Sequence, residues 1–94
     1  MLKVKAVPAT VRFRSEIDRA RTLGFGLQVR VEPGVPHAAF ARLVPQTKRA
    51  AQLCVAHGGR AVEARQTFDN VQDHADAIES AILAALDMVQ TADA

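Results

Sequence analysis

The feature that most constrains the fold is an apolar stripe in the last quarter of the sequence. When successive residues are placed 100° apart, as in a helix, one set of apolar side chains falls within about 60° of a single line. The set consists of Val71, Ala75, Ile78, Ile82, Ala85, Leu86 and Val89. Asp69 precedes the stripe, with Gln72 three residues later, which is the spacing of a capping box. The pattern predicts an amphipathic helix over about 70–90 that anchors the domain core.

The same helix carries two further sectors. One gathers the acidic side chains of Asp69, Asp73, Asp76, Glu79 and Asp87, and the other consists of Ala77, Ala81, Ala84 and Met88. Small side chains and a flexible methionine allow another helix to approach closely. We therefore expect that the helix either packs between two neighbours in the fold or offers Ala77, Ala81, Ala84 and Met88 to a partner, which is a second copy of the chain or another protein.

Length and composition predict one soluble domain over 1–94. The chain has 94 residues, of which 49% are hydrophobic and 23% charged, and a chain of this size does not divide its core in two. Its one cysteine, Cys54, has no internal partner for a disulfide, so packing must supply the stability and a reducing compartment is expected. The opening residues lack the continuous apolar segment of a signal peptide or membrane span. A cytoplasmic protein with no membrane contact is the expectation.

Charge is segregated along the chain. All 12 Lys and Arg lie within 1–65, whereas 66–94 holds acidic residues and no Lys or Arg. Such asymmetry predicts a contact between opposite charges. The contact would join the basic part to its own acidic helix, to a second copy, or to an external polyanion.

Alternation and turn residues define the remaining elements. Phe25, Leu27, Val29 and Val31 alternate with less apolar residues, which predicts a half-buried strand, and Pro33-Gly34 predicts the turn after it. The same reasoning over the rest of the chain predicts a bent strand over 2–7 and 11–14, a helix over 16–23, strands over 25–32 and 38–44, a helix over 48–57, and a strand over 60–67.

This order predicts an α+β fold with a small, mainly antiparallel sheet and helices packed on one face. It matches the ferredoxin-like βαββαβ order with an added C-terminal helix. Residues 53–56 fit a buried strand equally well, and the alternative is then an antiparallel sheet crossed by the C-terminal helix. The ending Thr67-Phe68-Asp69, followed by an Ala-rich amphipathic helix, resembles short uncharacterised proteobacterial proteins. That resemblance covers about the last third of the chain and implies no activity.

The sequence contains no motif that predicts catalysis. Cys54 and His57 have a spacing that could begin a zinc site, but a structural zinc usually has four ligands and the other histidines are only His37 and His74. On a helix, Asp73 and Asp76 point away from the apolar stripe and His74 lies at its edge, so these three do not converge on one ion. There is no glycine-rich phosphate loop and no serine elbow. We expect no enzymatic activity, no metal and no cofactor.

Two functions remain. The leading hypothesis is a small non-enzymatic interaction or regulatory protein, either a homodimer or an adaptor for another protein. The alternative is a weak nucleic-acid-binding protein, because outward-facing strand arginines would form a basic sheet face that follows phosphates. The arginines in question are Arg12, Arg14, Arg30 and Arg65. The chain has 4 Phe and no Tyr or Trp, which leaves few aromatic platforms for stacking bases.

Overall fold

The computed structural model describes residues 13–93, and the side chains within that range as far as 90. Its sheet consists of β1 (Phe25–Glu32), β2 (His37–Pro45) and β3 (Val62–Phe68). The strands follow the chain in the order β1-β2-β3, and each neighbouring pair is antiparallel. The predicted strands over 25–32, 38–44 and 60–67 are therefore confirmed, with small shifts at their ends.

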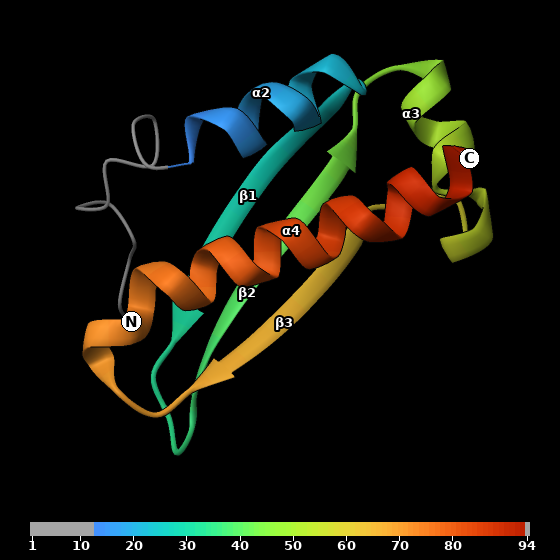
Figure 1. Ribbon diagram of the computed structural model, residues 1–94. Helices are drawn as coiled ribbons and strands as arrows, with labels where there is room; N and C mark the ends of the chain where they lie inside the picture. Colours follow the sequence, from blue (N-terminus) through green and yellow to red (C-terminus); the bar gives the residue numbers. More distant parts are fainter. Residues whose placement is uncertain (1–12, 94) are drawn as a thin grey trace.

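Two helices lie on the same face of this sheet (Figure 1). α2 (Arg14–Thr22) packs along β1, and α4 (His74–Asp93) crosses β2 and β3. α3 (Lys48–Leu53) connects β2 to β3 at the end of the sheet where α4 finishes (Figure 1). The predicted class, an α+β fold with helices on one face of a small antiparallel sheet, is confirmed for the described residues.

The ferredoxin-like order is wrong. In that order the first strand lies between the third and the fourth, which would separate the strand at 38–44 from the one at 60–67. Here His37 pairs with Phe68 and Leu43 with Val62, so β2 and β3 are direct antiparallel neighbours. The connection through α3 returns the chain to the free side of β2 instead of carrying it across the sheet. The predicted strand over 2–7 lies outside the described residues.

Three boundaries differ from those predicted. Arg14 belongs to α2, so the predicted strand over 11–14 does not reach it. The helix predicted over 16–23 begins two residues earlier, with Phe13 at the N-cap position. The helix predicted over 48–57 ends at Leu53 and a 3-10 turn follows, because Cys54 and Val55 already bond in shorter turns. At the other end, α4 starts at His74 rather than at 70.

The core forms where α4 meets the sheet. Ile78, Ile82, Leu86 and Val89 are at most 1% exposed, which confirms most of the predicted stripe, whereas Val71 lies outside the helix and is 62% exposed. Alanines line both sides of this contact: Ala39, Ala41 and Ala64 on the sheet, and Ala77, Ala81 and Ala85 on α4. Short side chains on both surfaces let the helix axis lie close to the strands.

A glycine joins the two layers. Gly24 follows α2 with φ +89°, and its carbonyl accepts a hydrogen bond from the Gln46 N–H at 2.9 Å. A Cβ at this position would collide with the hydroxyl of Thr47, the same hydroxyl that caps α3 by accepting from the Ala50 N–H at 3.0 Å. Only glycine satisfies both the left-handed backbone and the close approach.

The position of Ile82 in the core leads to a first stability prediction. Ile82→Ala should lower the free energy of unfolding by about 2–5 kcal/mol, because it leaves a cavity between α4 and the sheet. Leu83→Ala is the control: the neighbouring Leu83 is 42% exposed, so its truncation should change stability by about 0.5 kcal/mol or less. Urea unfolding measures both. Equal losses in the two variants would contradict the assigned orientation of α4.

A second prediction compares two glycines with left-handed backbones. Gly58 has φ +86° and nothing within 4 Å of a Cβ, so Gly58→Ala should lose only about 1–2 kcal/mol from backbone strain. Gly24→Ala carries the same strain and also displaces the Thr47 hydroxyl, so its loss should be larger by about 1 kcal/mol. Thermal and urea unfolding of the two variants test this, and a Gly24 variant no less stable than the Gly58 variant would refute the close contact.

Candidate functional site

The predicted basic face is only partly assembled. The strand register places Arg30 opposite Phe40 and Phe40 opposite Arg65, so two of the four arginines share the sheet face that lies away from the helices. Arg14 lies on α2, in the helical layer, and Arg12 lies outside the described residues. The prediction of one face with four arginines is therefore wrong for Arg14, because Arg14 begins a helix instead of belonging to a strand.

Arg30 is also engaged within the sheet. Its guanidinium carbon lies 4.0 Å from the centre of the Phe40 ring, its Nη1 donates to Glu63 at 2.8 Å, and its Nε donates to Glu32 at 3.3 Å. The bond to Glu63 raises the pKa of Arg30, so the charge is permanent but locally balanced. The same stacking covers one face of the Phe40 ring. Arg30 therefore has little uncompensated charge for a nucleic acid, whereas Arg65 is exposed on the same face.

The predicted partner face is not an exposed surface. Ala77 is 5% exposed and Ala81 is fully buried, and both belong to the core cluster beneath α4. Met88 is half-buried against the same cluster, so only Ala84 of the four is exposed. Of the two expectations for this sector, the structure supports packing between neighbours within the fold.

Residues with catalytic or metal-binding potential do not assemble. Cys54 is fully buried, and burial raises the pKa of its thiol, which disfavours the nucleophilic thiolate. The Nε2 of His57 lies 3.3 Å from the Met88 carbonyl oxygen on α4. Among the side chains of residues 13–90, no three His, Cys, Asp or Glu gather in a way that could hold a metal ion. Within residues 13–93 no helix has the length and apolar character needed to cross a bilayer.

Three aromatic rings stack at the end of the sheet near the start of α4. The ring centres of His37 and Phe68 are 5.2 Å apart, and those of Phe68 and His74 are 6.4 Å apart. His74 Nε2 is buried without a hydrogen-bond partner, as is Oε2 of Glu16 on α2. Neither residue lines the main pocket of the described residues. These rings pack against one another at the end of the sheet, away from the main pocket.

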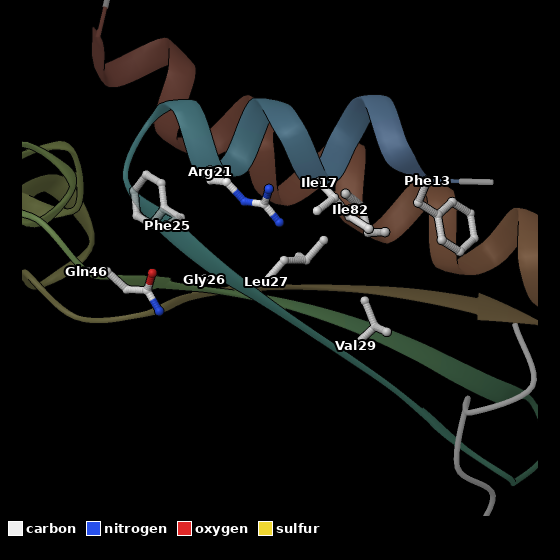
Figure 2. A pocket seen from close by; sticks show the side chains of 9 residues that line it. All are labelled: Phe13, Ile17, Arg21, Phe25, Gly26, Leu27, Val29, Gln46 and Ile82. Carbon is white, nitrogen blue, oxygen red and sulfur yellow. The ribbon is translucent and has the colours of Figure 1, made fainter. Parts of the chain in front are cut away.

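The main hollow lies between α2 and β1. It is a pocket of about 320 Å³, and Figure 2 shows its walls. The inward side chains of Phe25, Leu27 and Val29 form the strand side, and Ile17 on α2 and Ile82 on α4 form the helix side. Ile17, Leu27 and Val29 are only half-buried, unlike the core residues under α4. An open apolar pocket of this size is suited to one or two side chains of a ligand.

Two polar side chains border the pocket. The guanidinium of Arg21, in the last turn of α2, extends over it towards Leu27 (Figure 2). At the other end the amide of Gln46 lies against Gly26, where a Cβ would come within 2.7 Å of its Nε2. Among the side chains of residues 13–90, neither makes an ion pair or a hydrogen bond. Both are therefore available as hydrogen-bond donors to a ligand.

The backbone beside this pocket also has free hydrogen-bonding groups. The bond from Gln46 N to Gly24 O marks residues 24 and 46 as a hydrogen-bonded pair, and such pairs recur every second residue in an antiparallel ladder. The N–H and C=O groups of Gln28 and Arg30 thus point to β2, whereas those of Leu27, Val29 and Val31 point away from it. In the described part of the chain, β1 pairs only with β2. Within residues 13–93, the odd-numbered residues of β1 therefore form an unpaired sheet edge next to the pocket.

Sequence reasoning missed this site, although it found some of its residues. The alternation over 25–32 correctly predicted which side chains of β1 face inward. It contained no information that β1 is an edge strand, because that depends on strand order. Arg21 and Gln46 had no signal at all, since both are common surface residues.

Comparison with models of protein families, with curated proteins and with solved structures gives no significant match for this chain. The site therefore has to be interpreted from its own geometry.

The orientation of the β1 backbone can be tested with two proline variants. Gln28→Pro removes an N–H that points to β2 and leaves the Arg42 carbonyl unpaired, whereas Val29→Pro removes an N–H that points outward. We expect Gln28→Pro to lower the free energy of unfolding by about 1–3 kcal/mol more than Val29→Pro does. Urea unfolding of both variants measures the difference. The opposite order would show that the outward groups are assigned to the wrong residues.

Proposed function

We propose that this protein is a non-enzymatic interaction module that binds an extended segment of a partner protein along the open edge of β1. The observation that carries the proposal is the coincidence of unpaired backbone groups at Leu27, Val29 and Val31 with the apolar pocket beside them. In this mode the backbone hydrogen bonds contribute affinity, and pockets for alternate side chains contribute specificity.

The other edge of the sheet is a poorer docking site. By the same alternation, the outward backbone groups of β3 belong to Glu63, Arg65 and Thr67, which are exposed. Charged side chains on an edge strand discourage pairing with another chain. α4 also crosses β3, and no pocket described along that edge resembles the one at β1 in its apolar walls. The two edges thus differ in a way that favours β1.

The absence of a catalytic arrangement among the described residues fits a binding role. The buried thiol of Cys54 and the bonded ring of His57 are both remote from the pocket lining. The residues that do line it are apolar apart from Arg21 and Gln46. Such a surface can hold a side chain but offers no general base or nucleophile for a reaction.

The proposal can be tested with a phage-displayed library of random linear peptides selected on the purified protein. Peptides that bind along β1 should slow amide exchange at Leu27, Val29 and Val31, because their N–H groups become hydrogen-bonded. They should bind Val29→Pro at least about tenfold more weakly, the factor expected for the loss of one well-made hydrogen bond.

Val29→Ala is the matched control, since it shortens the side chain and keeps the N–H. It should retain more binding than Val29→Pro. The proposal is wrong if selection yields no binding peptide, or if the peptides bind Val29→Pro and Val29→Ala equally well and leave exchange along β1 unchanged.

A further inference from the structure

We propose that the segment bound along β1 is acidic, with a carboxylate that pairs with Arg21 and an apolar side chain two residues away that enters the pocket. This inference rests on the proposed function and specifies the kind of sequence that the β1 edge recognises. Its basis is the position of one cation over an otherwise apolar site.

Arg21 is placed to receive a carboxylate. It is exposed on α2, its guanidinium extends over the pocket (Figure 2), and it has no ion-pair partner among the side chains of residues 13–90. A guanidinium presents several N–H donors in a planar fork that matches the two oxygens of a carboxylate. Beside the apolar pocket, such a pair would be better shielded from water than one on the open surface.

The spacing in the partner segment follows from strand geometry. Successive side chains of a strand point to opposite faces of the sheet, so residues two apart lie on one face. Arg21 and the pocket are both on the face covered by the helices. An added strand that places an apolar side chain in the pocket must therefore carry its carboxylate two residues before or after it. The predicted recognition pattern is apolar-x-acidic or acidic-x-apolar.

The charges around the pocket and the groove that extends from it along α2 support an acidic occupant. A shallower hollow continues along α2 from Ile17 and Arg21 to Arg14 and Asp18, which adds one further cation and one anion. The charged side chains of the groove are thus two arginines and one aspartate. A basic segment would meet net repulsion there, and an acidic one net attraction.

The same argument disfavours two other occupants. Residues 1–12 contain Lys3, Lys5 and Arg12 and no acidic residue, so they offer no carboxylate to Arg21. A second copy pairing through its own β1 would present its inward residues 25, 27, 29 and 31, which are all apolar. Neither segment has an acidic residue two positions from an apolar one on the required face. A partner of different sequence is the better fit.

A double-mutant cycle tests this inference on peptides recovered from the phage-displayed library. The selected peptides should be enriched in the predicted pattern. Changing the acid of a synthetic copy to its amide should weaken binding to the wild-type protein about fivefold, and Arg21→Gln should weaken binding of the acidic peptide by a similar factor. Combining both changes should add little to either one, because they remove the same interaction.

Arg42→Gln is the matched control, because Arg42 is an exposed arginine on β2 that faces away from the helices. Its affinity for the acidic peptide should equal that of the wild type. Raising the salt concentration should weaken the acidic peptide more than its amide. The inference is overturned if acid and amide peptides bind equally, or if Arg21→Gln and Arg42→Gln behave alike.

These outcomes separate the inference from the proposed function. Peptides that protect the β1 amides and lose affinity for Val29→Pro, but that are indifferent to Arg21, would overturn the acidic specificity and leave binding along β1 in place. Protection of the β1 amides in the free protein at all concentrations would show that the chain covers its own edge, which overturns both. Protection that grows with protein concentration would identify a second copy as the occupant, which also overturns both.

Discussion

The close packing of α4 on the alanine-rich face of the sheet is the constraint on which the other features depend. Ala39 and Ala41 on β2 share one buried cluster with Ala81 and Ala85 on α4, and the helix lies over β2 and β3. Burial of the larger residues along α4 contributes about 1.5–3 kcal/mol for each of them. In the absence of a disulfide, this contact is the main source of stability for the described domain.

Because α4 lies over β2 and β3, the inner face of β1 is covered by the shorter helix α2. α2 has 9 residues, and its polar contact with α4 is a hydrogen bond of 2.7 Å from Arg19 to Gln90. It covers the end of β1 at Phe25, which is 3% exposed, but leaves Leu27 and Val29 half-buried. The pocket thus lies between β1 and the whole length of α2, since Phe13, Ile17 and Arg21 all line it.

The sequence predicted local structure well and assembly less well. The alternation at Phe25, Leu27, Val29 and Val31 and the stripe on α4 depend on the simple periods of a strand and a helix, and both appear in the structure. The order of strands depends on which residues meet across the chain, so the ferredoxin-like arrangement could not be distinguished from a simple meander. The role of Ala77 and Ala81 was ambiguous for the same reason. Small residues allow close packing, but they do not identify the neighbour.

Charge segregation illustrates the same limit. The separation of basic and acidic residues along the chain is real, but the arginines of the predicted basic face separate in space. Arg30 is balanced by Glu32 and Glu63 on the outer face, while Arg14 lies on α2 in the helical layer. Sequence shows how many charges a segment has, and the fold determines which of them face solvent.

The two helical walls of the pocket differ in how firmly they are held. Ile82 belongs to α4, whose buried face packs in the core cluster of the sheet, so a displacement of this wall would disrupt the core. Ile17 and Arg21 belong to α2, which is short and is held mainly through Phe13, Ala20 and the turn at Gly24. A larger guest would therefore displace α2 and leave α4 in place. A pocket with one fixed wall on α4 and one movable wall on α2 can accept side chains of several sizes without disturbing the packing of α4 on the sheet.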